Sequence, residues 1–360
     1  MERKSLSRPE VNLLIVDDSP LFRQLVNVVV QRFKNLSVIG LAENGEKAMK
    51  SVVENKPDVI LLDLEMPHID GFTFLRWLMV YYPTPVLVIS ARSDGYSVFR
   101  ALELGACDFY EKPSGNASLL DDPMELITKI ETISSISRES LSKKYAKMAK
   151  IQSKDELSKP LSKKKEGVSR ILAIGASTGG PPALVEIISN LPKTFPMPVV
   201  VSQHMPAGFT KSFSERLNKL SHLPVSEVDG GEPLEPGRVY IAPGGHHLIF
   251  EKRGSRIYTC LKKKGDGDRY APSVDLMMSS ASDIFGRGVL GLLLTGMGDD
   301  GKVGLSKVKE KGGMTIAESE ETAVVFGMPR EAIEAGVVDR ILPLHKMVAE
   351  INRYGRSVPK

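Results

Sequence analysis

The sequence predicts an α/β protein with two domains, each built on a parallel β-sheet. Its 360 residues are enough for two domains that each bury a core. Short apolar runs alternate with helical patterns in both halves of the chain, as they do in parallel sheets. A segment rich in serine and lysine, with few large apolar residues, separates the two halves.

The composition is that of a globular protein, with 42% hydrophobic and 26% charged residues. No apolar run approaches the roughly 20 residues of a membrane span, and the first residues are polar. We therefore expect a cytoplasmic protein without a secretory signal or membrane insertion. Cys107 and Cys260 are far apart and predict neither a disulfide framework nor a cysteine metal site. The net charge of +4 is small and many lysines fall in the middle segment, so we expect no nucleic-acid partner.

The first domain, predicted over residues 9–133, places polar side chains directly after its apolar runs. The runs are residues 13–16, 38–39, 59–62, 86–89 and 108–110. In a flavodoxin-like strand order the first and third strands are neighbours, so Asp17, Asp18 and Asp63 would form one acidic pocket. Such a pocket attracts Mg²⁺ and leaves one carboxylate as a nucleophile for a phosphoryl group, with Lys112 as its countercharge.

These residues resemble the receiver domain of two-component response regulators, over roughly residues 11–133. The resemblance implies that Asp63 accepts a phosphoryl group from a histidine kinase, while Ser90 and Lys112 contact that group. Asp17 would support the site through water. The implied ligands of Mg²⁺ are Asp18, Asp63 and the backbone carbonyl of Glu65.

Residues 134–167 are predicted to form a flexible basic linker, because they cannot bury a core of their own. A basic run of this kind can also bind a membrane or nucleic acid. Charge swaps that left partner binding unchanged would favour the linker.

The second domain, predicted over residues 168–354, is expected to be a doubly wound, mostly parallel sheet. Its predicted buried strands are residues 171–174, 199–201, 289–294 and 336–338. The first of them leads into GASTGGP, which predicts strand, tight turn and helix, with Ser177 at the helix N-terminus. Backbone N–H groups there can stabilise an anion beside a serine nucleophile. The GxSxG pattern alone is weak, since a phosphate-binding or purely structural glycine turn would look the same.

A serine nucleophile needs an imidazole to take its proton and a carboxylate to orient that imidazole. Two stretches past strand ends carry such groups: His204 in SQHMP and Asp300 in LTGMGDDG. These two residues are the best-placed base and acid. Other residues compete for the same roles: His246 and His247 as the base, and Asp275 and Asp299 as the acid.

Over residues 168–353 the chain resembles the catalytic domain of chemotaxis protein-glutamate methylesterases, the CheB family. The shared motifs are GASTGG, QHMP, APGGHHL, APSVD and LTGMGDDG, and a receiver precedes them, as it does in that family. The resemblance implies Ser177 as nucleophile, His204 as general base and Asp300 as orienting acid. The oxyanion hole would come from the backbone N–H groups of Thr178 and Met297. Two positions depart from the family pattern: Asp299 stands where asparagine is frequent, and Ala271 where arginine is common.

The implied function is a phosphorylation-regulated esterase that hydrolyses glutamate methyl esters on chemoreceptors and deamidates their glutamines. Its phosphodonor would be a chemotaxis histidine kinase, with Mg²⁺ needed only by the receiver. A receiver fused to a dinucleotide-binding module is a second possibility, but it would show GxGxxG and an acid about 20 residues later. A DNA-binding response regulator would show a helix-turn-helix with a basic recognition helix. The second half shows neither pattern.

Overall fold

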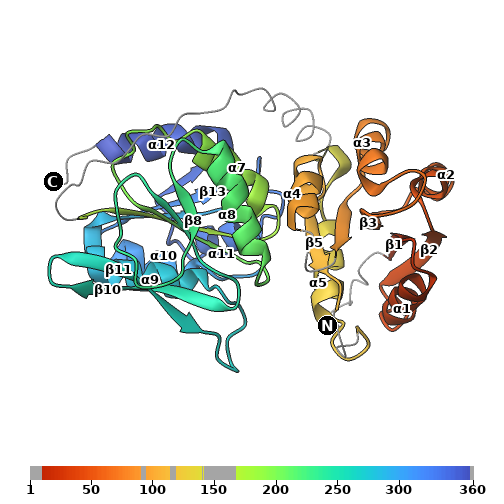
Figure 1. The fold of residues 1–360 in the computed structure, drawn as a ribbon, viewed down its shortest axis with the longest axis horizontal. Helices are drawn as coiled ribbons and strands as arrows, with labels where there is room; N and C mark the ends of the chain where they lie inside the picture. The colour runs from red at the N-terminus through yellow and green to blue at the C-terminus, as the bar shows by residue number, and fades with distance from the viewer. Residues whose placement is uncertain (1–9, 91–94, 114–118, 140, 142–167, 357–360) are drawn as a thin grey trace, which may run out of the picture. The chain divides into compact units, whose positions relative to one another are not determined.

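The computed structural model describes residues 10–90, 95–113, 119–139, 141 and 168–356. The chain divides into two compact units, residues 1–153 and 154–360, and each has its own parallel sheet (Figure 1). The predicted domains, 9–133 and 168–354, each fall inside one of these units. Most of the predicted linker, residues 140 and 142–167, lies outside the described residues.

The first unit contains a five-stranded parallel sheet in the order β2-β1-β3-β4-β5, so β1 and β3 are neighbours as predicted. The strands are β1 (Val11–Val16), β2 (Leu36–Ala42), β3 (Val59–Asp63), β4 (Val86–Ser90) and β5 (Asp108–Glu111). The helices are α1 (Pro20–Val30), α2 (Gly45–Asn55), α3 (Gly71–Tyr81), α4 (Gly95–Glu103) and α5 (Met124–Ser134). Every residue of β3 and β4 is buried, as expected for central strands covered by helices on both faces.

Side-chain caps fix where the helices of this unit begin. Ser19 Oγ accepts the N–H of Phe22 at 3.3 Å, and Pro20 suits the first turn of α1 because it has no N–H to satisfy. Asp70 Oδ1 accepts the N–H of Thr73 at 2.7 Å at the start of α3. Because α1 and α3 start soon after β1 and β3 end, the polar residues between them stay at the edge of the sheet.

The second unit contains a seven-stranded parallel sheet in the order β14-β13-β12-β6-β7-β9-β8. The strands are β6 (Ile171–Ala176), β7 (Val199–Gln203), β8 (Val225–Glu227), β9 (Val239–Ile241), β12 (Val289–Leu293), β13 (Met314–Glu318) and β14 (Arg340–Leu342). A separate antiparallel hairpin consists of β10 (His246–Arg253) and β11 (Arg256–Lys263). The order of the sheet reverses at β6, and ligand sites of open α/β sheets form at such a reversal.

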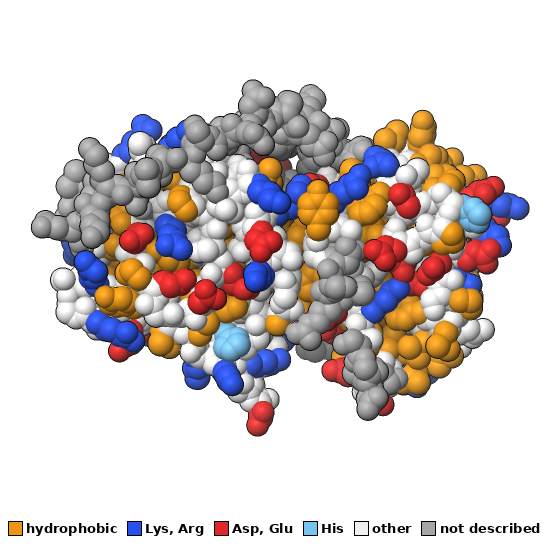
Figure 2. Space-filling model, in the orientation of Figure 1, with side chains coloured by type: hydrophobic (Ala, Val, Ile, Leu, Met, Phe, Trp, Pro, Cys, Tyr) orange, Lys and Arg blue, Asp and Glu red, His pale blue; other side chains and the backbone are white. Residues whose placement is uncertain are grey.

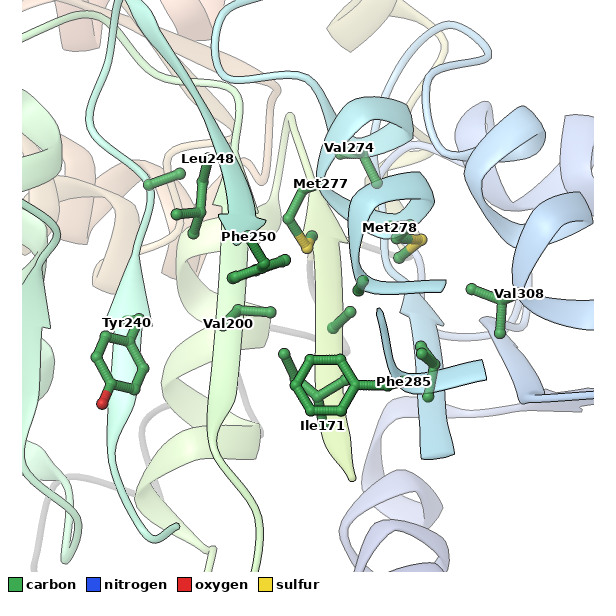
Figure 3. Close-up of a cluster of buried hydrophobic side chains, with 14 of the residues drawn as sticks. Ile171, Val200, Tyr240, Leu248, Phe250, Val274, Met277, Met278, Phe285 and Val308 are labelled. Atoms are coloured by element: carbon green, nitrogen blue, oxygen red, sulfur yellow. The ribbon is translucent and has the colours of Figure 1, made fainter. Parts of the chain in front are cut away.

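The helices of the second unit are α7 (Gly180–Ser189), α8 (Phe209–Leu220), α9 (Val274–Phe285), α10 (Lys302–Glu310), α11 (Met328–Glu334) and α12 (Leu344–Arg356), with a short 3₁₀ turn, η1 (Gly286–Gly288). Helix α9 and strand β10 supply much of a buried cluster on the sheet. Figure 3 shows Phe285 of α9 beside Ile171 of β6, Met277 of α9 farther along the same strand, and Phe250 of β10 near Val200 of β7. This packing fixes the N-terminal end of α9 over the carboxyl edge of the sheet.

The strand predicted at residues 336–338 is wrong. Gly336 has a φ of +70°, a left-handed conformation that favours glycine at a helix end, and the N–H of Val337 bonds to the carbonyl of Ala332. Val337 and Val338 pack against the core from a turn, so their apolar character reflects burial without a strand. The edge strand begins only at Arg340.

Acidic and basic side chains are intermixed over the face shown in Figure 2, in keeping with 48 basic and 44 acidic residues in the chain. Among the residues that the structure describes, no helix combines the length and apolar character needed to cross a bilayer.

Candidate active site

Three adjacent strands of the second sheet bring the predicted catalytic residues to one edge. Ser177 follows β6 and His204 follows β7, and the two strands pair Ala176 with Gln203 just before them. The N–H of His204 donates to the carbonyl of Ala176 at 3.0 Å, which makes the two turns neighbours. Asp300 lies in the loop between β12 and α10, and β12 pairs with β6 on its other side.

The turn that carries Ser177 depends on glycine. Gly179 has a φ of +76°, and a Cβ there would come within 2.3 Å of Val324. The N–H of Ser177 donates to the carbonyl of Thr295 at 3.0 Å, and the N–H of Gly180 donates to the carbonyl of Ser177 at 2.7 Å. Helix α7 then begins at Gly180 with proline in its first turn, so the predicted order of strand, turn and helix is confirmed.

Gln203 links the turn that carries Ser177 to the turn that carries His204, a role that the sequence analysis did not predict. Its Nε2 donates to the carbonyl of Ser177 at 2.9 Å and to the carbonyl of His204 at 3.0 Å. Its Oε1 fits because Gly180 has no side chain: a Cβ there would lie 2.0 Å from that oxygen. The only available signal was the glutamine directly before the histidine in QHMP.

His204 and Asp300 are in direct contact, with 2.7 Å between Nε2 and Oδ2. With the proton on Nε2, the lone pair lies on Nδ1, a buried atom with no hydrogen-bond partner among the described residues. The structure shows no hydrogen bond between the Ser177 hydroxyl and His204. Nδ1 is therefore the nitrogen that remains to take a proton from a hydroxyl group.

Asp300 also caps α9. It accepts the N–H of Val274 at 2.7 Å, the N–H of Asp275 at 2.9 Å and the hydroxyl of Ser273 at 3.1 Å. Burial alone would raise the pKa of Asp300, but the hydrogen bonds from His204 and the helix N–H groups outweigh burial, so the pKa is lowered. An ionised carboxylate in fixed contact with the imidazole is what orientation of a base requires.

The competing acids have other roles. Asp299 is exposed and forms long ion pairs, at 3.7 Å to Arg269 and 3.8 Å to Lys302. Asp275 Oδ1 accepts the N–H groups of Gly301 at 2.8 Å and Gly304 at 2.6 Å, which caps α10. Asp300 thus caps α9, and Asp275 at the start of α9 caps α10. Together the two carboxyl groups hold α9 and α10 against each other.

Burial, assisted by the charge of Asp300, raises the pKa of Asp275 from 3.8 to about 6. The folded protein therefore holds this proton more tightly than the unfolded chain, and stability should fall as pH rises through this range. Asp275→Asn keeps an acceptor for the two N–H groups but cannot ionise. We expect the unfolding free energy of this variant, relative to wild type, to rise by about 1–3 kcal/mol between about pH 4 and pH 7.

Urea unfolding of the second unit at both pH values would measure this difference. Asp283→Asn, which removes an exposed charge from the same helix, is the control for charge alone. A difference between Asp275→Asn and wild type that stays constant with pH would contradict the prediction.

The backbone after β12 lies against the nucleophile. A Cβ on Gly296 would come within 2.7 Å of Ser177 Cβ, so only glycine permits this approach. The hydroxyl of Thr295 donates to the carbonyl of Thr178 at 2.9 Å, which ties this loop to the nucleophile turn. Of the predicted oxyanion residues, Thr178 directly follows Ser177 in the chain, and Met297 follows Gly296, which lies against Ser177.

The structure shows two contacts of histidine rings that the sequence analysis did not predict, one of His204 and one of His247. The ring of Tyr270 stacks on the imidazole of His204, with centroids 4.2 Å apart and planes 7° from parallel. His247, a competing base in the sequence, is fully buried and has its own carboxylate partner, with 2.8 Å between Nε2 and Asp268 Oδ2. No local sequence pattern connects residues so far apart along the chain.

The predicted acidic pocket of the first unit is present. Carboxylate oxygens of Asp17, Asp18 and Asp63 all lie within 4.8 Å of one another, a set of hard oxygen donors that fits Mg²⁺. Lys112 Nζ lies 2.8 Å from Asp17 Oδ2 and also hydrogen-bonds Asp63. Ser90 is buried at the end of β4, and its carbonyl accepts the N–H of Lys112 at 2.8 Å.

Charge pairing and burial compete in this pocket. Burial by itself would lower the pKa of Lys112, but its hydrogen bonds to Asp17 and Asp63 outweigh burial and raise it. Burial raises the pKa of Asp17 despite the opposing effect of Lys112. The N–H of Glu65 donates to Asp63 Oδ1 at 3.0 Å, so the backbone of Glu65 turns beside the same carboxylate.

Comparisons with known proteins match each half of the chain to a family. A family model described as CheB methylesterase matches residues 172–351, and one described as response regulator receiver domain matches residues 13–122. The chain is 45% identical to protein-glutamate methylesterase/protein-glutamine glutaminase 3 of Geobacter sulfurreducens, over 95% of this chain and 96% of that protein. It is 40% identical to the protein-glutamate methylesterase/protein-glutamine glutaminase of Thermotoga maritima, over 94% of this chain and 96% of that protein.

Among solved structures, the crystal structure of the Thermotoga maritima CheB methylesterase catalytic domain is similar to the second half of the chain. It is 46% identical, covers 51% of this chain and 98% of its own, and gives a TM-score of 0.50. The shared motifs, the fold and the 45% identity over 95% of the chain lead to one conclusion. The chain belongs to the CheB methylesterase family, with a response regulator receiver domain before its catalytic domain.

Proposed function

We propose that this chain hydrolyses glutamate methyl esters on chemoreceptors, and deamidates receptor glutamines, with Ser177, His204 and Asp300 as its catalytic triad. The observation that carries the proposal is the contact between His204 Nε2 and Asp300 Oδ2, directly beside the Ser177 turn, in a chain of this family. The relatives named above are called protein-glutamate methylesterase/protein-glutamine glutaminase, which gives the substrate class.

In the first half-reaction, Ser177 Oγ attacks the ester carbonyl carbon while His204 Nδ1 takes the hydroxyl proton. The N–H groups of Thr178 and Met297 stabilise the negative charge that develops on the carbonyl oxygen. The tetrahedral intermediate collapses, the C–O bond to the methoxy group breaks, and the imidazolium returns its proton to release methanol. An acyl group remains on Ser177.

In the second half-reaction, water attacks the acyl carbon and gives its proton to His204. Collapse of this intermediate breaks the bond to Ser177 Oγ, which recovers the proton, and leaves a glutamate side chain. A glutamine amide follows the same route with ammonia as the leaving group. Asp300 stabilises the imidazolium in both halves, because its carboxylate is ionised and held by helix α9.

The receiver regulates this activity through phosphorylation of Asp63. An Asp63 carboxylate oxygen attacks the phosphorus of a phosphohistidine on the kinase, the P–N bond breaks, and the imidazole leaves. Lys112 and Ser90 contact the transferred group. Asp18, Asp63 and the Glu65 carbonyl would hold Mg²⁺, which neutralises phosphoryl charge when bound. We place the protein in the cytoplasm, where kinase and receptor signalling domains are accessible to it.

One experiment tests both the activity and its regulation. Methanol release from a methylated receptor segment is measured for the full chain, the full chain treated with a phosphodonor, and the segment 168–360. We expect hydrolysis by all three, with the segment and the phosphorylated chain faster than the untreated chain, because the proposed regulation requires the unphosphorylated receiver to favour a less active state. Absence of methanol in every arm would refute the esterase, whereas equal rates would refute only the regulation by the receiver.

A further inference from the structure

The loop between β11 and α9 contacts the proposed base, and this contact has no role in the mechanism above. The ring of Tyr270 lies parallel to the imidazole of His204, at a centroid distance of 4.2 Å and an angle of 7°. The other contact of the imidazole, with Asp300, is made through Nε2 at one edge of the ring. A planar ring held at one edge can still rotate about that contact, and a second ring against its face prevents this rotation.

The other end of the Tyr270 ring reaches the loop of the proposed oxyanion hole. Gly298 has a φ of +89°, and a Cβ there would come within 2.6 Å of the Tyr270 hydroxyl oxygen. Tyr270 is half-buried, and burial raises the pKa of its hydroxyl. One side chain thus packs against both His204 and the residue next to Met297.

A second histidine–aspartate pair fixes the loop that presents Tyr270. Asp268 accepts from His247 Nε2 at 2.8 Å and from the N–H of Gly265 at 2.7 Å. His247 is fully buried at the start of β10, so this end of the contact cannot move with the loop. The N–H of Gly245 also donates to the carbonyl of Ala271 at 3.1 Å, which closes the loop on the other side of Tyr270.

We propose that Tyr270 is a positioning residue that holds the His204 imidazole in its productive plane, and that the His247–Asp268 pair latches the loop that carries it. The inference rests on the proposed function of His204 as a base. When His204 takes up a proton, the electron-rich face of Tyr270 also stabilises the positive charge. The positive charge of Arg269, whose Cζ lies 5.1 Å from the Tyr270 ring centroid, would repel a protonated His204. Asp299, 3.7 Å from Arg269, offsets part of that charge.

Variants of the full-length protein test the proposal. Tyr270→Phe keeps the ring, Tyr270→Leu keeps an apolar side chain without a ring, and Asp268→Ala opens the latch. Tyr258→Leu is the matched control, because Tyr258 is a partly buried tyrosine of the β10–β11 hairpin whose ring lies against Arg253. Each variant is compared in kcat and KM on the receptor segment, and in the rate at which a small fluorophosphonate modifies Ser177, a reaction without receptor contacts.

We expect Tyr270→Leu to lower both kcat and the fluorophosphonate rate by about 10- to 100-fold, with KM changed by less than about twofold. Tyr270→Phe should restore both rates to within about threefold of wild type, and Asp268→Ala should fall between the two. In NMR spectra, the His204 ring protons should lose an aromatic ring-current shift in Tyr270→Leu and keep it in Tyr270→Phe.

Three results would overturn the proposal: a fluorophosphonate rate in Tyr270→Leu equal to wild type, a change in KM alone, or an equal loss in Tyr270→Phe. The first two would make Tyr270 a structural or substrate-binding residue, and the third would assign its effect to the hydroxyl. If wild type hydrolysed no ester, the proposed function would fail, but the ring-current shift would still decide whether the stack holds the imidazole.

Discussion

Replacing Ser177 by alanine is expected to reduce kcat for ester hydrolysis by about a millionfold, toward the residual rate that binding and the oxyanion hole supply. The reason is that Ser177 is the proposed nucleophile, and without its hydroxyl the acyl-enzyme cannot form. Folding should survive, because the bonds that hold the turn are made by backbone atoms of Ser177 and its neighbours. Methanol release and fluorophosphonate labelling measure the loss, and thermal unfolding checks the fold.

Ser202 provides a matched control for this substitution. It lies at the end of β7, opposite Gly175 in the register, and its buried hydroxyl has no hydrogen-bond partner among the described residues. Ser202→Ala should therefore keep kcat within about threefold of wild type, since removing an unsatisfied buried hydroxyl costs little. More than about one per cent of wild-type kcat in Ser177→Ala would show that another group attacks the ester.

Replacing Asp63 by asparagine should abolish phosphorylation, because an amide oxygen is a far weaker nucleophile than a carboxylate oxygen. Asp17 and Asp18 are the carboxylates that remain in the pocket, and neither is the proposed acceptor. The affinity for Mg²⁺ should fall with the loss of one charged ligand. The unit should stay folded, since Lys112 keeps its contact with Asp17 at 2.8 Å. Labelling by a small phosphodonor, and the activation of methanol release that follows, measure the effect.

Asp70→Asn is the matched control in the receiver. Asp70 caps α3, and asparagine caps helices as well as aspartate does, so phosphorylation should be unchanged. Persistent labelling of Asp63→Asn would show that a different residue accepts the phosphoryl group.

Local patterns in the sequence were sufficient for most of the sheet architecture. Strands β3 and β4 of the receiver and the central strands β6, β7 and β12 are fully buried, and continuous apolar runs are typical of such strands. Edge strands are different: β14 is mostly exposed and was not predicted, while the apolar residues 336–338 lie in a turn. Apolar character reports burial, and burial and strand conformation coincide only in the middle of a sheet.

The sequence by itself determined the family, the two α/β domains and the residues expected at their strand ends, because motifs and buried strands are local in the chain. The roles of Ser177, His204 and Asp300 stay predictions that the geometry supports. Only the tertiary structure decided that Asp300 and Asp275 cap each other's helices, that Gln203 joins two turns, and that Tyr270 lies on His204. Such contacts join side chains distant in sequence or depend on how a loop folds back, so they exist only once strands, helices and loops have packed together.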